Sequence, residues 1–467
     1  AAMIGKLKQM HVLIIGLRGL GVEIAKNLIL AGPHTVMVYD EGLVKVEDLG
    51  TNFYLYEADI GTSRAKASLR QLGELNPNVN VGHVQLPKMT TEEICKYDVV
   101  CVADANVPLD DLIAWNEAAR SRYQINPDTG ANEHHPTAFI HAAISGVTGF
   151  VFSDFGDQFR VFDADGVPVR SVVIDHISKD ANGVVTIDGD RHLLSDGDIL
   201  KIEEVRGMSD EFPLVKEHEK DLKTFQHNEV ITDINSFVQI KTTKNPKRFT
   251  IGDTTKLGDY INGGVATQVK QEQIFKFESL KKQLTKPTFI SSYMDFSKFG
   301  RDAILHIAHY AIWRFQSEKG RFPGLHSDAD ADEVCKIAQA IVEEHKKLPS
   351  GEGVVPDDLD LNIVRQVALY HAAELPPIAA LFGGVVAQEI TKQTGKYSPM
   401  QQWFHYDAME LLAGDKPPAD STPIGSRYDH QIAIFGKAFH DRLAQQKVFL
   451  VGSGALGCEF IKAFALM

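Results

Sequence analysis

Apolar and polar positions near the start of the chain follow two different periods. An apolar run from Val12 to Ile15 ends at Gly16, and from Leu20 to Leu30 the apolar residues recur at helical spacing. A second apolar run, Thr35 to Asp40, follows. The order of strand, glycine turn, helix and strand predicts the opening of a doubly wound α/β domain.

Two later segments are continuously apolar rather than alternating. They are Tyr97–Ala103 and Ala138–Ile144. Such runs are typical of strands in a parallel sheet that is covered on both faces. We therefore expect residues 1–166 to form one layered α/β unit.

Short alternating runs dominate from about 167 to 268. The turn dipeptides Asn182-Gly183, Asp188-Gly189 and Asp196-Gly197 separate them. This pattern predicts a small antiparallel barrel or sandwich inserted after the first sheet.

Residues 270–350 return to helical spacing and predict a small helical bundle. One apolar stripe runs from Ile304 to Phe315, and Asp330–Lys347 is a second amphipathic segment. Two more helices are expected within 360–394, separated at Pro376-Pro377.

A last strand is predicted at Met400–Asp407, where it would rejoin the first sheet. The Pro- and Gly-rich stretch Ala413–Gly425 after it has the composition of a linker.

Composition narrows the class of protein. A length of 467 residues predicts several domains, and a formal net charge of −14 without like-charged blocks argues against nucleic acid as a partner. With no apolar run of about 18 residues and no leading basic-then-apolar segment, neither a membrane span nor secretion is predicted. The expected location is the cytoplasm and nucleus.

Cysteine and histidine usage predicts neither a disulfide nor a metal site. The four cysteines, Cys95, Cys101, Cys335 and Cys458, are scattered without CxxC spacing. We expect reduced and mostly buried thiols. The pair His134-His135 and His141 have no acidic or cysteine partner at ligand spacing.

An internal repeat is the most informative feature of the chain. Residues 7–30 recur near the carboxyl end at a constant offset, since 452 minus 16 is 436. Leu7, Gln9, Val12, Gly16, Leu20, Gly21, Glu23, Lys26 and Leu30 match Leu443, Gln445, Val448, Gly452, Leu456, Gly457, Glu459, Lys462 and Leu466. Duplication explains these matches better than chance does.

The second copy carries a complete glycine-rich loop. Gly452, Gly454, Ala455 and Gly457 give GxGxxG, in which small residues let phosphate oxygens approach backbone N–H groups at a helix start. We predict that this loop can bind a nucleotide.

The first copy is degenerate at the position that matters most. Gly16, Gly19 and Gly21 are present, but Arg18 replaces the middle glycine, which a pyrophosphate needs to pass. Asp40, about 20 residues after the loop, would suit a ribose hydroxyl and leaves an NAD-dependent oxidoreductase as an alternative. Arg18 counts against that alternative.

Several segments together resemble the ubiquitin-activating enzymes. They are Gly16–Asn27, Asp59–Gly61, Gly183–Thr186, Gly383–Glu389, Gln402–Ala408 and Arg427–Gln431. The resemblance covers nearly the whole chain in the family's order. The exception, Asn126–Pro136, is interpreted as an inserted surface loop.

The resemblance implies a domain plan. Residues 1–166 and 352–412 would be the inactive adenylation domain, 167–268 the first catalytic-cysteine half-domain, 270–350 a four-helix bundle, and 420–467 the start of the active adenylation domain. In this family ATP and Mg are used to adenylate the ubiquitin C-terminus. Ubiquitin then passes to a cysteine as a thioester, and from there to a ubiquitin-conjugating enzyme.

The family's nucleotide residues are carried over only in part. Asp48, Thr51 and Arg64 stand where an Asn, an Arg and a Lys would clamp phosphate, so the first copy is expected to be inactive. In the second copy the ATP loop is present, and Arg427 precedes it in the segment that carries a nucleotide-contacting arginine. The rest of the site, with the thioester cysteine, is expected beyond Met467.

The chain is accordingly interpreted as a fragment, cut at both ends. It would be a scaffold that contacts ubiquitin and the missing active half and holds no cofactor by itself. Three alternatives stay open: a related ubiquitin-like modifier, a binding module that works without nucleotide, and the NAD-dependent oxidoreductase.

Overall fold

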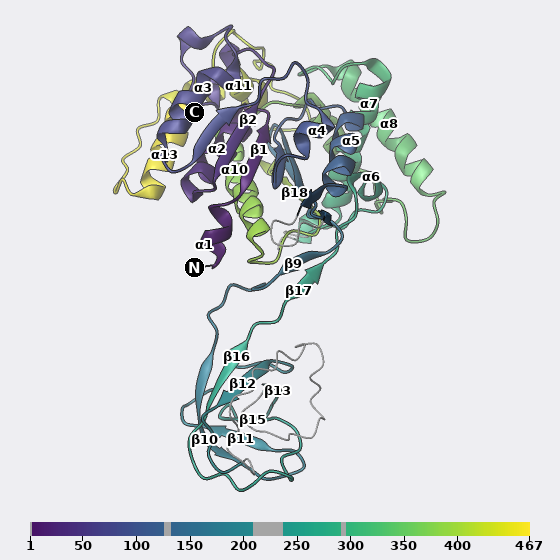
Figure 1. Ribbon diagram of the computed structural model, residues 1–467. Coiled ribbons are helices and arrows are strands. Elements are labelled where there is room, and N and C mark those ends of the chain that lie inside the picture. Colours follow the sequence, from purple (N-terminus) through teal and green to yellow (C-terminus); the bar gives the residue numbers. More distant parts are fainter. Residues whose placement is uncertain (1, 126–131, 209–236, 291–295) are drawn as a thin grey trace. The chain divides into compact units, whose positions relative to one another are not determined.

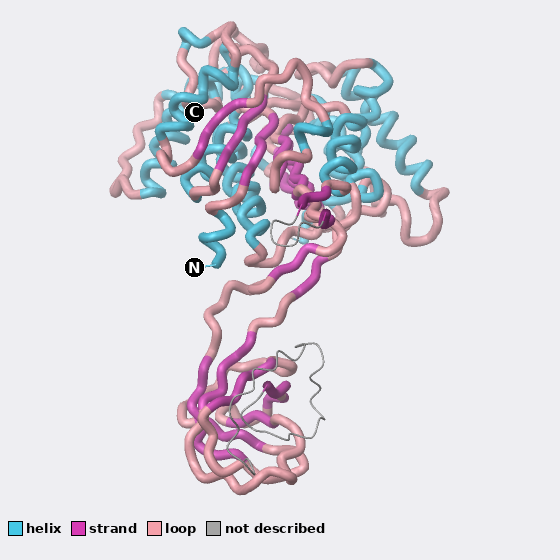
Figure 2. The backbone as a smooth tube through the Cα atoms, in the orientation of Figure 1, coloured by secondary structure: helices cyan, strands magenta, loops and turns pink. Residues whose placement is uncertain are grey.

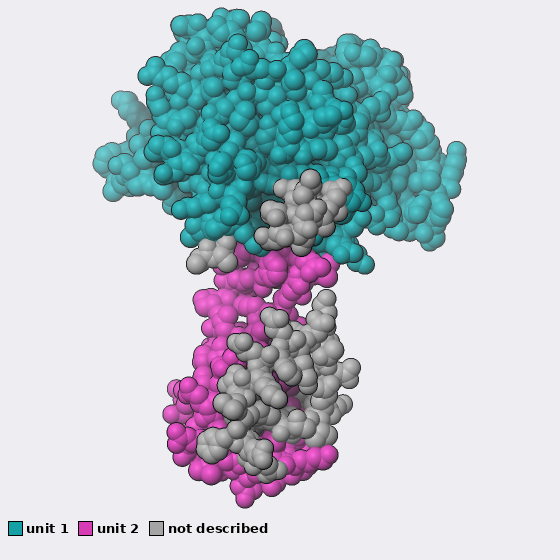
Figure 3. All heavy atoms as spheres, in the orientation of Figure 1, with its two compact units in different colours: residues 1–159, 275–394, 399–467 teal, residues 160–274, 395–398 magenta. Residues whose placement is uncertain are grey.

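The computed structural model describes residues 2–125, 132–208, 237–290 and 296–467 (Figures 1 and 2). They divide into two compact units, shown in different colours in Figure 3. The larger unit contains residues 1–159, 275–394 and 399–467, and the smaller one contains residues 160–274 and 395–398.

A seven-stranded sheet forms the centre of the larger unit. Its order is β18-β8-β7-β4-β1-β2-β3. The strands are β1 His11–Ile15, β2 Thr35–Tyr39, β3 Asn80–His83, β4 Val99–Val102, β7 Ala138–Ser145, β8 Thr148–Asp154 and β18 Trp403–Asp407. The first five pair in parallel, and β8 and β18 are antiparallel. The predicted parallel sheet and the return of the strand near residue 403 are thus confirmed.

Helices cover both faces of this sheet, as expected for a doubly wound fold. Val12 and Ile14 of β1 pack with α2 (Gly19–Ala31) and α10 (Pro376–Thr391) in one core. Leu13 and Ile15 point to the other face, in a core shared with α5 (Leu109–Arg120). Alternate residues of one strand therefore enter two cores, which explains the uninterrupted apolar run.

Shorter elements complete the larger unit. They are α1 Ala2–Leu7, α3 Arg64–Glu74, α4 Thr91–Ile94, α6 Leu280–Gln283, α11 Asp429–Phe435, α12 Lys437–Ala444, α13 Ala455–Leu466, and the 3₁₀ turns η1 Val46–Gly50, η2 Glu57–Asp59, η4 Phe296–Lys298, η5 Lys392–Thr394 and η6 Met409–Leu411. The hairpin β5 (Tyr123–Ile125) and β6 (Asn132–His134) corrects part of the predicted loop at 126–136, since its last residues pair as a strand. Residues 126–131 lie outside the described part of the chain.

Three helices pack around one further apolar core. They are α7 (Arg301–Lys319), α8 (Asp328–His345) and α9 (Leu361–Leu369). The predicted stripe, from Ile304 to Phe315, is buried there. The segment expected to be a four-helix bundle thus holds two long helices, and α9 from the following segment is the third that joins their core.

The smaller unit is an antiparallel sheet of order β13-β12-β16-β10-β11-β15-β14. Its strands are β10 Ser171–Ile177, β11 Val184–Ile187, β12 Ile199–Glu203, β13 Phe237–Gln239, β14 Lys241–Thr242, β15 Arg248–Thr250 and β16 Val265–Val269; β9 Phe159–Val161 pairs separately with β17 Gln273–Phe275. The β-rich insertion is therefore confirmed, and residues 209–236 within it lie outside the described part.

All four cysteines are free, but they are not mostly buried as predicted. Cys101 is buried, Cys95 and Cys335 are half-buried, and Cys458 is exposed at the start of α13. Within the described ranges, no helix is long and apolar enough to cross a membrane, and no three His, Cys, Asp or Glu side chains group as metal ligands would.

Candidate functional site

The two glycine-rich loops have the same backbone conformation. Gly16 and Gly452 have φ of 90° and 94°. The residues that precede the helices, Arg18 and Gly454, have φ/ψ of −75°/−164° and −71°/−164°. The arginine therefore replaces a glycine without changing the turn, because this conformation is open to any residue.

The last glycine of each motif has a packing role that both copies share. A Cβ atom on Gly21 would lie 2.0 Å from the Gly16 carbonyl oxygen, and one on Gly457 would lie 2.2 Å from that of Gly452. Both glycines thus close the same tight turn from strand to helix.

The loop of the second copy has Gly454 at the position of Arg18. A Cβ on Gly454 would meet no atom within 4 Å, and α13 begins at the next residue, Ala455. Backbone N–H groups at the start of a helix favour anions. Gly454 therefore has no side chain that would block a phosphate at this helix start.

The loop of the first copy is filled by its own chain. Arg18 donates from Nη1 to the Ala372 carbonyl oxygen at 3.0 Å, and its Nε lies 3.5 Å from a carboxylate oxygen of Asp48. Glu374 accepts a hydrogen bond of 3.2 Å from the Leu20 N–H in the first turn of α2. A buried carboxylate thus occupies the helix start that a phosphate would need.

Burial and neighbouring charge have opposite effects on the pKa values of Arg18 and Glu374. Burial raises the pKa of Glu374, and the nearby Arg18 counteracts this rise. Burial alone would lower the pKa of Arg18, but the carboxylates of Glu374 and Asp48 outweigh it, so this pKa is raised. Each charge therefore compensates for the burial of the other.

A further set of ion pairs engages Arg64, one of the residues at which the sequence analysis expected the family's phosphate clamp. Arg64 donates from Nη1 to both oxygens of Asp40, at 2.7 and 2.8 Å, and from Nε to Asp48 at 3.1 Å. Asp40 also accepts hydrogen bonds of 2.7 Å from the Leu17 and Gly42 N–H groups. Because both oxygens of Asp40 already accept hydrogen bonds, Asp40 is a poor ligand for a ribose hydroxyl. The oxidoreductase hypothesis depended on that role of Asp40 and therefore loses its support.

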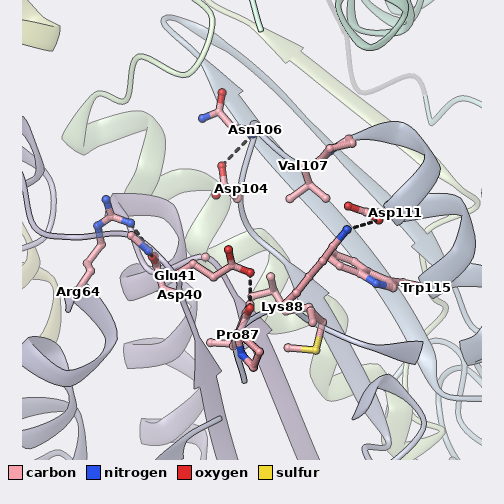
Figure 4. A pocket seen from close by; sticks show the side chains of 16 residues that line it. Asp40, Glu41, Arg64, Pro87, Lys88, Asp104, Asn106, Val107, Asp111 and Trp115 are labelled. Atoms are coloured by element: carbon pink, nitrogen blue, oxygen red, sulfur yellow. Dashed lines mark hydrogen bonds and ion pairs between the residues drawn. The ribbon is translucent and has the colours of Figure 1, made fainter. Parts of the chain in front are cut away.

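A cavity of about 380 Å³ lies beside Gly16 at the carboxyl ends of β1, β2 and β4 (Figure 4). Its charged lining consists of Asp40, Glu41, Arg64, Lys88, Asp104 and Asp111. The two cations face carboxylates, Arg64 at Asp40 and Lys88 at Asp111, the latter at 3.2 Å. This excess of negative charge disfavours a triphosphate.

Helices α2 and α13 of the two copies meet through reciprocal ion pairs. Lys26 lies 2.6 Å from Glu459, and Lys462 pairs with Glu23. The offset of 436 relates Glu23 to Glu459 and Lys26 to Lys462, so each copy contributes the same two side chains. Such an exchange is what a local two-fold axis produces.

The sequence analysis did not identify Glu374, whose carboxylate lies at the start of α2, where a phosphate would bind. It lies 354 residues after Leu20, and no spacing rule connects the two. Arg427, predicted as a cofactor ligand, donates to the Leu49 carbonyl oxygen and thus lies against η1 in the first copy. A Cβ on Gly50 would be 2.1 Å from the Arg427 carbonyl oxygen, so the contact is close.

The environments of three of the four cysteines do not favour a nucleophile. Burial raises the pKa of the Cys95, Cys101 and Cys335 thiols. A raised pKa lowers the fraction of thiolate, the reactive form. His141 is equally unsuited to bind a metal, because it is buried and its Nδ1 contacts the Val102 carbonyl oxygen.

Comparison with known proteins shows the family to which the chain belongs. The model of the ThiF family matches residues 2–420, and the chain belongs to that family. Among curated proteins it is 36% identical over 465 residues to ubiquitin-activating enzyme E1 1 of Triticum aestivum, and 38% identical over 467 residues to that of Arabidopsis thaliana. These alignments cover 98% of this chain and 40% and 39% of the relatives, so the chain spans about two fifths of their length. A solved structure, E. coli MccB with succinimide, is 18% identical with a TM-score of 0.27 and covers 33% of this chain and 44% of its own.

A matched pair of substitutions tests how tightly the first loop is filled. Gly19 corresponds to Ala455, and a Cβ on Gly19 would lie 2.4 Å from the Thr51 Cβ and 2.6 Å from a Glu374 oxygen. We expect Gly19→Ala to lower the free energy of unfolding by about 2 kcal/mol, as overpacking does. The reverse change, Ala455→Gly, should cost about 1 kcal/mol or less. Urea unfolding of both variants measures the difference, and equal costs would contradict the crowding.

Proposed function

We propose that this chain is the nucleotide-free scaffold part of an enzyme that uses ATP to adenylate the C-terminus of ubiquitin. One observation carries the proposal. Two loops share a single backbone conformation, yet the first carries Arg18, hydrogen-bonded to the chain around it, with the Glu374 carboxylate at its helix start, whereas the second has Gly454 at the position of Arg18. A duplicated loop that is closed in one copy and keeps the GxGxxG pattern in the other suits an enzyme in which one half works and the other supports it.

The proposed domain plan follows the resemblance. Residues 1–166 and 352–412 form the inactive adenylation domain, 167–268 the first catalytic-cysteine half-domain, and 420–467 the start of the active adenylation domain. Residues 270–350, which contain the long helices α7 and α8, are the segment that the resemblance assigns to a four-helix bundle. The reciprocal ion pairs between α2 and α13 support the assignment of residues 420–467, because they join the two copies of the repeat.

ATP would be held by the second copy. Backbone N–H groups from Gly452 to Gly457, at the start of α13, would contact its phosphates, and ATP with Mg would supply the activated acyl phosphate in the whole protein. Ubiquitin and ubiquitin-conjugating enzymes are the proposed partners. A related ubiquitin-like modifier is the alternative substrate.

Exchange of pyrophosphate into ATP in the presence of ubiquitin tests this proposal. Because the first loop is closed, we expect this 467-residue chain to show no exchange above background. Adding a separately produced active adenylation half should restore it if the two parts assemble. Robust exchange by the chain alone would overturn the proposal, and so would exchange that depends on Gly16–Gly21.

Ubiquitin binding without nucleotide distinguishes the second candidate, a binding module. The calorimetric titration is done with ubiquitin and ATP-free chain. Saturable heat would favour a ubiquitin-binding role for this chain. Absence of saturable heat would argue against the binding module and leave the scaffold as the proposed role.

A further inference from the structure

Helices α2 and α13, which lie side by side in Figure 1, are joined by a closed set of four charged side chains. Lys26 Nζ lies 2.6 Å from a Glu459 oxygen and 3.0 Å from a Glu23 oxygen. Lys462 Nζ lies 2.8 Å from the other Glu459 oxygen and pairs with the other oxygen of Glu23. Each carboxylate therefore faces both ammonium groups, and the charges of these four side chains, the charge quartet, cancel.

The charge quartet is shielded from water on the α2 side. The side chains of Glu23 and Lys26 are only 3% and 7% exposed. The aromatic ring of Phe53 lies against the quartet, with its centroid 4.6 Å from the Lys462 nitrogen. Burial lowers the pKa of Lys26, but the two glutamates outweigh it, so this pKa is raised. Because a buried charge without its partner is costly, the quartet favours one arrangement of the two helices.

Few other contacts hold α13 in this chain. Gly457 and Leu466 are its buried residues, and the helix also contacts α10. Within the described ranges, every hydrogen bond between α13 and another element comes from the charge quartet. A helix of twelve residues is only marginally stable by itself in water. The orientation of α13 therefore depends on the quartet.

The charge quartet lies close to the Gly452–Gly457 loop along the chain. Glu459 comes four residues after Ala455, the first residue of α13, so the quartet begins about one turn after the helix start. The backbone N–H groups that would contact a phosphate belong to that helix start. A displacement of α13 would move these donors away from a bound anion, and a misplacement of about 1 Å can cost about a hundredfold in rate.

The equivalent residues of α2 have no phosphate of their own to position. Glu23 and Lys26 follow the loop that Arg18 and Glu374 close. Their partners across the interface lie on α13. Through this contact, the copy whose loop is closed influences the helix that follows the other loop.

We propose that Glu23 and Lys26 are positioning residues for phosphate binding at the Gly452–Gly457 loop of the other copy. They touch no nucleotide, and they act by holding α13 so that its first N–H groups face the phosphates of ATP. This inference rests on the proposed function, in which that loop binds ATP. It gives the closed copy a defined part in the reaction in addition to general support.

Pyrophosphate exchange by the whole protein, with its active adenylation half, tests the proposal. We expect Lys26→Glu to raise the KM for ATP by at least about tenfold, because three carboxylates would then surround Lys462. The KM for ubiquitin should change less than about twofold, since the change acts on the phosphate loop alone. The double variant Lys26→Glu, Glu459→Lys exchanges the two charges and should recover most of the parent KM for ATP. The matched control, Lys66→Glu, changes an exposed helical lysine outside the quartet and should leave both KM values within about twofold.

Amide hydrogen exchange in the 467-residue chain measures the position of α13 directly. Exchange at Gly454–Cys458 should be at least about tenfold faster in Lys26→Glu than in the parent, and slow again in the double variant. Exchange in β4 and β7 should be unchanged, which verifies that the variants are folded. Should Lys26→Glu not fold, Glu23→Gln removes one charge, keeps the side-chain shape and should give the same effects at about threefold.

The outcomes separate this inference from the proposed function. An unchanged KM for ATP in a folded quartet variant would overturn the inference and leave the proposed function intact. Equal rises in the KM for ATP and for ubiquitin that the charge exchange does not reverse would also overturn it, because they would indicate general loosening. A parent protein without pyrophosphate exchange would overturn the proposed function and this inference with it.

Discussion

Replacing Arg18 by Ala is expected to lower the free energy of unfolding of the larger unit by about 3–5 kcal/mol, the usual cost of stripping a buried charge of its partner. Glu374, only 6% exposed, would keep its position at the start of α2 and lose the positive charge of Arg18, which offsets its burial. Asp48 would be affected less, because Arg64 still donates to it. Urea unfolding at neutral pH measures the loss.

A double variant separates the electrostatic interaction of Arg18 with Glu374 from the packing around them. Glu374→Gln keeps an oxygen that can accept from the Leu20 N–H, and Arg18→Leu keeps most of the side-chain volume. Together they should cost no more than about 1–2 kcal/mol, since no charge is then buried alone. A double variant as unstable as Arg18→Ala would contradict the assigned pairing, because the loss would then come from packing.

The same reasoning makes Arg18→Gly an informative variant. It restores the GxGxxG pattern, but Glu374 would still lie at the helix start and repel phosphate. We therefore expect no ATP binding from this change alone. Arg18 and Glu374 together close the degenerate loop, and only Arg18 lies within the sequence motif.

Local patterns predicted the larger part of the fold. The apolar runs at β1, β2, β4 and β7 and the helical spacing of α2 and α7 are decided by neighbouring residues, and all of them were found where expected. The repeat also predicted two equivalent turns, because Gly16 and Gly21 have counterparts at Gly452 and Gly457 with the same geometry.

Long-range contacts account for what sequence patterns did not show. Glu374 reaches Leu20 from a loop before α10, and Arg64 reaches Asp40 and Asp48 from the start of α3. The helix α9 joins α7 and α8 because its apolar face fits theirs, although the spacing placed it outside that segment. The exposure of Cys458 likewise depends on which elements pack against α13, and the residues next to it in the sequence do not determine it.

Acid is expected to destabilise the larger unit more than its carboxylates alone would explain. His141, His306 and His309 are buried with Phe150, Trp313 and Trp403 between α7 and the sheet. Burial lowers the pKa of His141 and His306 to about 4, and that of His309 to about 3. These rings are therefore neutral in the folded protein.

The sign of the effect follows from the direction of these shifts. A histidine whose pKa is lower in the folded state binds fewer protons there, so its stabilising contribution is present above about pH 6.5 and is lost as the pH falls towards 4. Between pH 7 and pH 5 each such histidine should cost about 1.8 kcal/mol, and the three together about 5 kcal/mol.

Urea unfolding at pH 7 and pH 5 should show this loss, and one variant should reduce it. His309 has no hydrogen-bond partner for Nε2 among the residues that the structure describes, so His309→Phe should leave the protein at least as stable at pH 7. At pH 5 that variant should lose about 1.8 kcal/mol less than the parent, because one proton fewer is taken up on unfolding. The exposed His34, changed to Gln, is the control and should leave the pH dependence as it was. An unchanged pH dependence in His309→Phe would show that this ring is not held neutral by burial against the sheet.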